Sequence, residues 1–456
     1  MLRFFVALVA AKMAKLAITI LKPITHSEGS HFPGQLALKI CPYFLSRAAR
    51  PNLVIAVTGT NGKTTLSNML SDVFQHAGYT VISNRWGSNM EPGVASILSE
   101  NSTLSNRSRA QVAVVEVDEK SSKRIYSRIT PDYLVCTQFT RDSMMRNAHP
   151  YYIFDFVNNN LPNGVKMILN ADDLISSSLK KENPRAYYSI AKQPFDVLKK
   201  SLVNDAKVCP ICNSPLTYDY TRYDHIGYAH CDKCGFTSPE ADYVLTDMDY
   251  EKRIIRINCK GTSHEFHMVS DGIFNTYDQL AAISLFVEYG LDIEKIKSAF
   301  EDLHVVESRY MTDEIDGVEF TSNMTKSLIA PACSAIFDYI TSRPKEKEIV
   351  LFIEDPHTID NNAYMYETDF EYFNNPSVNK IIIVGKRPQE FYLRFLFAGV
   401  PKEKMVQLGS IEEIDKHLSF KRGTAIYLLY DNYQVSTNTR AREIIKKALE
   451  GGAAHD

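Results

Sequence analysis

Apolar residues fall into short runs along the first two thirds of the chain, and polar or glycine-rich segments separate the runs. We expect strands at residues 54–57, 80–83, 111–119, 133–139 and 166–173, and of these 54–57 and 111–119 should be buried. Stretches with helical periodicity lie between them, such as residues 65–77, which end before Gly78. This alternation is typical of a doubly wound α/β architecture, so we predict a parallel sheet with helices on both faces.

The last third of the chain repeats the alternation on a smaller scale. Apolar runs at residues 348–353, 380–384 and 424–429 are separated by helical stretches at 388–399 and 411–418. We therefore predict a second, smaller parallel sheet, followed by a helix at the C-terminal end.

Three domains follow from these patterns. We expect an N-terminal helical segment at residues 1–50, a central domain at residues 51–304 and an α/β C-terminal domain at residues 305–456. Within the central domain, an insert at about residues 205–240 precedes a helix pair at 274–285 and 291–303.

The first 22 residues include an apolar run at residues 4–11 that resembles the centre of a signal peptide. Lys12, Lys15 and Lys22 interrupt the apolar pattern, and the run is shorter than the roughly 20 apolar residues needed to span a bilayer. We expect an amphipathic helix that packs on the protein. Contact with a membrane surface and a cleaved signal peptide are the alternatives.

The segment 54–66 combines a buried strand, a glycine-containing loop and the start of a helix. Backbone N–H groups in such a loop form an anion site, Lys63 adds a positive charge, and the Thr64 hydroxyl can face Mg²⁺. We predict that a nucleoside triphosphate is bound by Gly59, Thr60, Asn61, Gly62, Lys63, Thr64 and Thr65. The usual phosphate-loop spacing would place a glycine where this chain has Val57, so an ordinary glycine-rich turn is the alternative.

Carboxylates stand at the end of the strand predicted at residues 111–119, namely Glu116, Asp118 and Glu119. Open parallel sheets bind ligands at the carboxyl ends of their strands, so one of these groups can hold Mg²⁺ opposite the phosphate loop. Surface acids without a role are the alternative. The strand ends near residues 139 and 173 are also polar, as a nucleotide cleft requires.

Four of the eight cysteines form two C-x-x-C pairs, Cys209 with Cys212 and Cys231 with Cys234. This double knuckle is a strong signal for a structural, four-coordinate Zn²⁺ site, whereas two disulfides would require an oxidising compartment. The remaining cysteines, Cys41, Cys136, Cys259 and Cys333, are isolated, and we expect them to be buried thiols.

The overall charge of the chain gives no support to nucleic-acid binding. The 456 residues carry a net charge of −3, so no basic field is available to attract a polyanion.

The residues 58–64, the strand ending at Glu116, residues 170–173 and Asn275 resemble the central domain of the Mur ligases, which are ATP-dependent carboxylate–amine ligases of cell-wall synthesis. The four-cysteine insert resembles the MurT group within this family. That resemblance implies that the chain is the ligase subunit of a cytoplasmic complex. The complex would amidate the D-glutamate of lipid II, and a GatD-like glutaminase partner would supply the ammonia.

The resemblance also implies roles for individual residues. Thr64 and Glu116 would bind Mg²⁺, Asn275 would contact the adenine of ATP, and Lys63 would act in catalysis. Arg309 would reach ATP from the C-terminal domain, although a surface arginine is an equal alternative.

The chain departs from the MurT group at a residue that would face the glutaminase. Asn361 stands where the group has an aspartate that completes a Cys-His dyad on its partner, and Asp360 precedes it. Either Asp360 substitutes for that aspartate, or the coupling to the glutaminase is weakened. The alternative functions are a divergent ligase acting on another carboxylate and an ATP-binding partner protein without chemistry.

Overall fold

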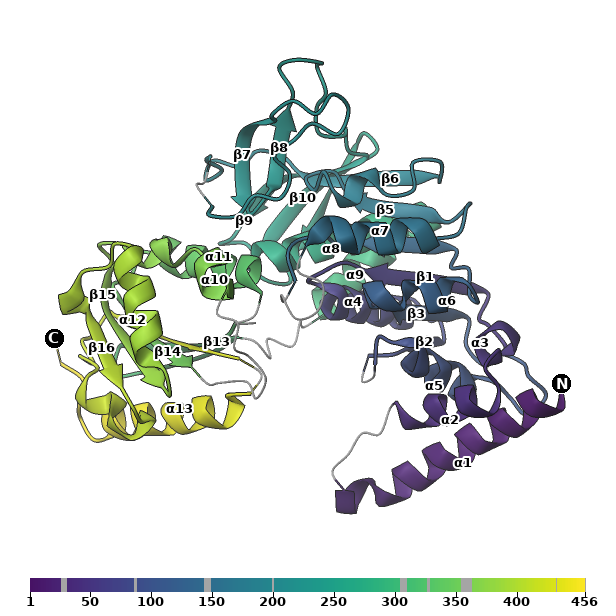
Figure 1. Cartoon of the computed structure of the whole chain (residues 1–456), viewed down its shortest axis with the longest axis horizontal. Helices are drawn as coiled ribbons and strands as arrows, with labels where there is room; N and C mark the ends of the chain where they lie inside the picture. The colour runs from purple at the N-terminus through teal and green to yellow at the C-terminus, as the bar shows by residue number, and fades with distance from the viewer. Residues whose placement is uncertain are drawn as a thin grey trace.

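The computed structural model describes most of the chain. The described residues are 1–25, 31–85, 88–142, 149–198, 201–303, 310–325, 329–353, 363–431 and 433–455. They form a large sheet and a smaller sheet that lie side by side, with a separate two-stranded hairpin above the large one (Figure 1). None of the described helices has the length and hydropathy needed to cross a membrane.

The large sheet has nine strands in the order β11-β10-β9-β6-β5-β4-β1-β3-β2. Their bounds are Leu53–Thr58 (β1), Val81–Ser83 (β2), Val112–Glu116 (β3), Tyr133–Cys136 (β4), Lys166–Asn170 (β5), Arg185–Ile190 (β6), Tyr243–Asp249 (β9), Ile254–Cys259 (β10) and Thr262–His267 (β11). Seven neighbouring strands, from β2 to β9, pair in parallel. The predicted fold class is confirmed, but β10 and β11 add an antiparallel edge that the apolar pattern did not predict.

Strand β1 is buried along its whole length because helices cover both faces of the sheet. Ile55 and Val57 pack on one side with α4 (Lys63–His76), α8 (Ile273–Tyr289) and α9 (Ile293–Asp302). Val54 and Ala56 pack on the other side, together with α5 (Glu91–Asn101), α6 (Ser122–Tyr126) and α7 (Pro150–Asn160). The successive side chains of one strand therefore belong to two different cores.

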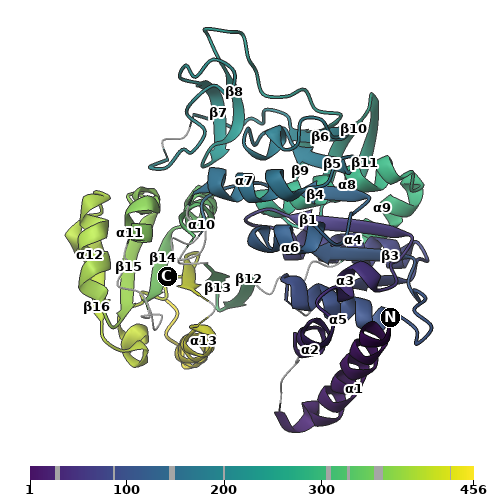
Figure 2. The ribbon, with the colours of Figure 1, turned by 45° about the vertical axis from the view of Figure 1, so that its right-hand side comes forward.

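The N-terminal segment forms α1 (Leu2–Thr25), α2 (Phe32–Ile40) and α3 (Phe44–Arg47). Helix α1 lies at the outer edge of the molecule in both ribbon views and packs on α2 and α5 (Figures 1 and 2). This arrangement fits the expected packing helix.

The hairpin of β7 (Thr217–Tyr223) and β8 (Ile226–His230) is inserted between β6 and β9. It stands above the end of the large sheet, coloured teal in Figure 1. The insert therefore lies in the connection between β6 and β9, two parallel strands that are neighbours in the sheet.

The smaller sheet has six strands in the order β12-β13-β17-β14-β15-β16. Their bounds are Tyr310–Ile315 (β12), Val318–Met324 (β13), Lys347–Ile353 (β14), Val378–Gly385 (β15), Met405–Leu408 (β16) and Ala425–Tyr430 (β17). Helices α10 (Ala330–Ser342), α11 (Ala363–Glu367), α12 (Pro388–Phe397) and α13 (Val435–Glu450) cover it. The three predicted strands are present and pair in parallel, whereas β12 is antiparallel to β13. The helix predicted at residues 411–418 is a short 3₁₀ helix, Ile411–Lys416.

Candidate functional site

The loop between β1 and α4 depends on two glycines with positive φ. Gly59 has a φ of 127° and Gly62 a φ of 85°. A Cβ on Gly59 would lie 2.0 Å from Thr137 Oγ1, and one on Gly62 would lie 2.4 Å from Asp278 Oδ1. Both the backbone conformation and the close neighbours therefore require glycine at these positions.

The end of β4 holds this loop in place. The Thr60 N–H donates to the carbonyl of Gln138 over 2.8 Å, and Thr137 Oγ1 donates to the carbonyl of Asn61 over 2.6 Å. The side-chain Nδ2 of Asn61 is buried, and it has no hydrogen-bond acceptor among the described residues. A buried donor without an acceptor, just before the N-terminus of α4, fits a phosphate oxygen as its acceptor.

Thr64 and Glu116 meet at the start of α4. Thr64 Oγ1 donates to Glu116 Oε2 over 2.9 Å, and Asn89 Nδ2 donates to Glu116 Oε1 over 3.1 Å. A hydroxyl and a carboxylate next to a phosphate loop are oxygen ligands of the kind that Mg²⁺ prefers. These two side chains therefore suit a magnesium ion that also contacts bound phosphates.

The other two carboxylates at the end of β3 have different partners. Asp118 accepts the Lys120 N–H over 3.1 Å, which caps a short 3₁₀ helix. Glu119 Oε1 lies 2.8 Å from Lys63 Nζ. Of the three acids considered in the sequence, Glu116 is the one that contacts Thr64.

Lys63 lies at the first turn of α4 with 13% of its side chain exposed, and it pairs with Glu119 and also donates to the carbonyl of Gly59. Burial alone would lower the pKa of Lys63, but the neighbouring Glu119 carboxylate outweighs this effect and holds the pKa above its usual value. Lys63 is therefore positively charged at neutral pH, as a phosphate-binding lysine must be.

These groups surround a cavity of about 170 Å³. Its lining is almost entirely polar and consists of Thr60, Gly62, Lys63, Thr64, Thr65, Asn89, Glu116, Glu119, Asp142 and Ile329. Ile329 immediately precedes α10, which covers the smaller sheet, so both halves of the molecule contribute to the wall. Asn89 and Asp142 were not predicted as site residues, although each lies in a polar segment beyond the carboxyl end of a strand.

A second cavity, of about 390 Å³, lies between the large sheet and the smaller sheet. Ser270, Asp271 and Gly272 line one side, and Tyr339, Arg343 and other residues of the C-terminal half line the other. Asn275 Nδ2 donates to Ser270 Oγ over 2.9 Å. Asn275 thus stands beside this cavity, one helical turn before Asp278 and the phosphate loop.

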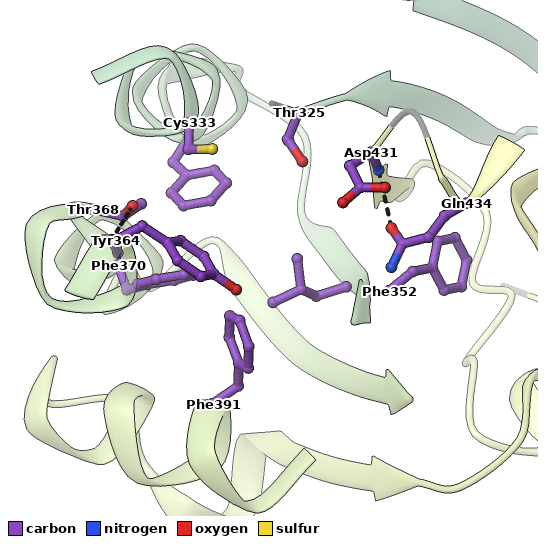
Figure 3. Close-up of a pocket in the computed structure, with 11 residues that line it drawn as sticks. Thr325, Cys333, Phe352, Tyr364, Thr368, Phe370, Phe391, Asp431 and Gln434 are labelled. Atoms are coloured by element: carbon purple, nitrogen blue, oxygen red, sulfur yellow. Dashed lines mark hydrogen bonds between the residues drawn. The ribbon is translucent and has the colours of Figure 1, made fainter. Parts of the chain in front are cut away.

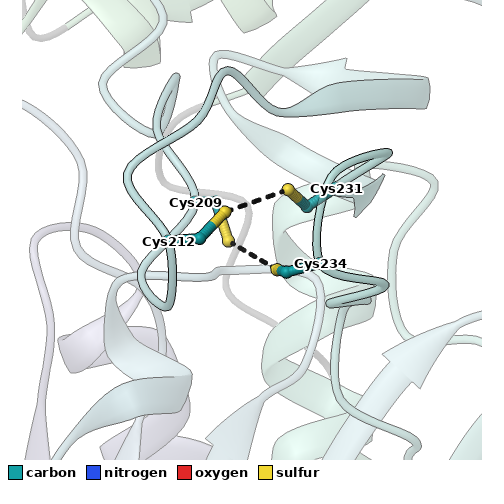
Figure 4. A group of neighbouring side chains, drawn as sticks. All are labelled: Cys209, Cys212, Cys231 and Cys234. Carbon is teal, nitrogen blue, oxygen red and sulfur yellow. Dashed lines mark hydrogen bonds between the residues drawn. The ribbon is translucent and has the colours of Figure 1, made fainter.

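The four paired cysteines come together at the tip of the insert (Figure 4). Cys209 Sγ lies 3.6 Å from Cys234 Sγ, and Cys212 Sγ lies 3.5 Å from Cys231 Sγ. Thiolates about 2.3 Å from a tetrahedral Zn²⁺ would be separated by roughly 3.8 Å. The cluster has this size, and all eight cysteines are free, so the disulfide alternative is wrong. The other four cysteines are buried as expected.

Asp172 and Asp173 anchor the insert instead of facing a nucleotide. Asp172 Oδ2 accepts hydrogen bonds from Arg222 over 2.9 Å and from the Tyr277 hydroxyl over 2.6 Å. Asp173 Oδ1 lies 3.0 Å from His225 Nε2. The polar end of β5 was expected to belong to the nucleotide cleft, and this expectation is wrong because buried partners from the hairpin occupy both carboxylates.

The insert also contacts the C-terminal half. Arg141 binds Asp205 with its Nε over 2.9 Å and also pairs with Glu367 of α11. The Leu202 N–H donates to Asp369 Oδ1 over 2.6 Å. The base of the insert is therefore linked to both sheets.

A small cavity of about 20 Å³ lies at the carboxyl ends of β13, β14 and β17 (Figure 3). Tyr364, Phe370 and Phe391 form its apolar side, and Asp431 and Gln434 form its polar side. It has room for about one water molecule. Three residues predicted to act in this half of the molecule, Arg309, Asp360 and Asn361, lie outside the described residues.

Two family models match the chain. Residues 57–208 match the Mur ligase middle domain, and residues 331–434 match the MurT ligase C-terminal domain. Together the two matches cover more than half of the chain.

Curated relatives match over nearly the full length. The lipid II isoglutaminyl synthase (glutamine-hydrolyzing) subunit MurT of Staphylococcus aureus (strain COL) is 29% identical, over 97% of this chain and 98% of the relative. The protein of the same name from Streptococcus pneumoniae (strain ATCC BAA-255 / R6) is 25% identical, over 92% of this chain and 95% of the relative.

Solved structures share the fold at lower sequence identity. A pseudomurein peptide ligase type C from Methanothermus fervidus has a TM-score of 0.65 and 22% identity, over 89% of this chain and 80% of that one. The MurF ligase from Thermotoga maritima, in complex with ADP, has a TM-score of 0.61 and 14% identity, over 92% of this chain and 84% of that one.

Proposed function

Because the chain belongs to the Mur ligases, in their MurT group, we propose that it is the ATP-dependent ligase subunit of a lipid II isoglutaminyl synthase. Its reaction would convert the D-glutamate of lipid II into D-isoglutamine in peptidoglycan synthesis. The observation that carries the proposal is the hydrogen bond between Thr64 and Glu116 beside a charged Lys63, in a chain that ends in a MurT-type domain.

The chemistry would proceed in two steps. A carboxylate oxygen of the substrate attacks the γ-phosphorus of ATP, the bond to the bridging oxygen breaks, and ADP leaves. Ammonia then attacks the acyl phosphate, inorganic phosphate leaves, and a proton is lost to give the amide. Neither step needs covalent help from the protein, so positioning and charge stabilisation carry the catalysis.

The residues around the polar cavity have matching roles. Thr64 and Glu116 would hold the Mg²⁺, which supplies positive charge to the phosphate oxygens. The backbone of residues 59–62 would bind the phosphates, and Lys63 would neutralise charge on the transferring group. Asn275, which stands beside the larger cavity, would contact the adenine.

The ammonia would come from a partner. The curated relatives are named as subunits of a glutamine-hydrolyzing enzyme, which supports a complex with a glutaminase subunit. We propose a GatD-like glutaminase that docks on the C-terminal domain, with Asp360 or Asn361 facing its dyad. The four-cysteine cluster would hold a structural Zn²⁺, because four protein ligands leave no position for a substrate.

The test is an amidation assay with the purified chain and its glutaminase. Lipid II, ATP, Mg²⁺ and glutamine are combined, and mass spectrometry follows the decrease of a single mass unit that replaces a hydroxyl by an amino group. Product with glutamine supports the complete proposal. Product with ammonium alone would place the defect in the coupling to the glutaminase, and no product with either nitrogen source would overturn the proposal.

A further inference from the structure

Helix α1 buries one apolar face against the rest of the protein. Phe4, Ala7, Leu8 and Ala11 recur at helical spacing and are at most 5% exposed. The ring of Phe4 stacks on that of Phe44 with centroids 5.2 Å apart. These contacts fix which side of the helix faces outward.

The outward side of α1 is also apolar. Seven side chains on it are between 36% and 78% exposed, namely Leu2, Phe5, Val6, Val9, Met13, Leu16 and Ile20. At 3.6 residues per turn they fall within an arc of about 100°. We call this set the α1 stripe. Single exposed apolar residues are ordinary, but a continuous row along a helix marks an interaction surface.

The N-terminal segment that carries the stripe has a positive net charge. Residues 1–50 contain seven lysines and arginines and a single glutamate, which gives this segment a net charge of +6 in a chain whose total is −3. Arg3 lies beside the stripe and is exposed. Lys12 donates to the Ser99 carbonyl over 2.7 Å, and Lys15 pairs with Glu100 over 3.1 Å. Both lysines thus tie α1 to α5 with the stripe turned outward.

From this combination we infer that α1 lies in the plane of a bilayer that contains anionic phospholipids, with the α1 stripe in the acyl boundary and the neighbouring cations at the headgroups. Amphipathic helices with this charge pattern bind such surfaces. A second copy of the chain is a poorer occupant, because packing stripe against stripe would bring two segments of +6 together. The membrane contact is argued from α1 alone. Its benefit, which is to bring the active site close to a lipid substrate, rests on the proposed function.

The experiment is flotation of the full chain with vesicles, without nucleotide or substrate. One vesicle set contains phosphatidylglycerol and phosphatidylcholine, and the other contains phosphatidylcholine alone. We expect binding to the first set that is at least about ten-fold tighter than to the second and that weakens with added salt.

Three double variants separate the causes. Met13→Glu with Leu16→Glu, and the neutral Met13→Gln with Leu16→Gln, should each weaken binding at least about ten-fold, because both remove apolar area from the α1 stripe. Leu393→Glu with Phe397→Glu is the matched control, since these α12 side chains are 47% and 67% exposed, respectively. All altered side chains are exposed, so the fold should be unaffected.

The outcomes are decisive in each direction. Loss of binding in both α1 variants but not in the control supports the inference. No binding of the unaltered chain, equal loss in the control, or a dimer that the α1 variants dissociate without any vesicle binding would overturn it. Amidation of a detergent-dispersed substrate by the α1 variants should continue, so failure at the membrane and failure of the proposed reaction are measured separately.

Discussion

Thr64 Oγ1 donates a hydrogen bond to Glu116 Oε2 over 2.9 Å, although the two residues are 52 positions apart in the sequence. The parallel pairing of β1 and β3 brings them together, because the helix after β1 and the end of β3 lie at the same edge of the sheet. The proposed magnesium site is therefore a product of the sheet topology.

The first prediction concerns this pair. Thr64→Ala and Glu116→Gln should each lower kcat/KM for ATP roughly 100-fold, because each removes an oxygen ligand from the proposed metal site. Calorimetry with and without Mg²⁺ measures the accompanying loss of magnesium-dependent nucleotide binding. Thr64→Ser keeps the hydroxyl and should retain most of the activity. If nucleotide binding by the Glu116→Gln variant depended on magnesium as in the unaltered chain, Glu116 would not be a magnesium ligand.

The second prediction concerns Lys63. Lys63→Ala should abolish turnover, because Lys63 is the one basic side chain among the described residues that line the polar cavity. It should also cost about 3–5 kcal/mol of unfolding free energy, since Glu119 is left buried without its partner.

A double variant separates these two effects. Lys63→Met combined with Glu119→Gln removes both charges and should recover most of the stability, as measured by urea denaturation, without recovering turnover. Recovery of both properties would show that Lys63 acts only in folding.

The third prediction concerns the cysteine cluster. Cys231→Ser should lower the zinc content measured by elemental analysis and should lower the melting temperature by roughly 5 °C or more, because a structural Zn²⁺ contributes to stability directly. Cys136→Ser is the control, because it alters a buried thiol outside the cluster, and this variant should retain the zinc content of the unaltered chain. A zinc-free Cys231→Ser protein that is as stable as the unaltered chain would contradict the structural role.

The fourth prediction is a pH dependence at His225. Its ring lies between Asp173 and Asp224, and Asp205, which pairs with Arg141, belongs to the same cluster. Burial lowers the pKa of His225, but the charge of Asp224, which lies 3.3 Å from Nδ1, and the hydrogen bond between Nε2 and Asp173 outweigh burial and raise the pKa from 6.5 to about 10. The stabilisation from the charged ring is complete below the unfolded pKa and is lost as the pH rises through the folded one.

The corresponding variant is His225→Gln. Its destabilisation should be largest near about pH 6 and should shrink by about 1 kcal/mol or more by about pH 10, because the unaltered protein loses its charged pair over that range. Denaturation midpoints across the range measure the difference. A destabilisation that does not change with pH would show that the ring is neutral in the folded protein.

The features that could be predicted from the sequence are local. The order of residues 59–64 fixes the phosphate loop, and the spacing of Cys209, Cys212, Cys231 and Cys234 fixes the cluster, because both depend on neighbours in the chain. The family resemblance is confirmed by the two family models and the curated relatives. The assignments of individual site residues stay predictions.

The features that were missed depend on distant partners. Asp172 looks like a ligand at a strand end, and only the folded chain shows that Arg222, 50 residues later, neutralises it. The antiparallel edge of β10 and β11 was missed because its strands carry many polar residues, such as Arg256 and Glu265, that pair with each other across the exposed surface.

The insert between β6 and β9 has a consequence for how the chain folds. These two strands pair in parallel, yet about 50 residues separate Ile190 from Tyr243. Closing so long a loop costs conformational entropy before the strands can pair, and a metal that joins the two knuckles shortens the loop that must close. A Zn²⁺ bound early at the cluster would therefore lower the entropic cost of pairing β6 with β9, although only modestly, because the cost of closing a loop changes slowly with its length.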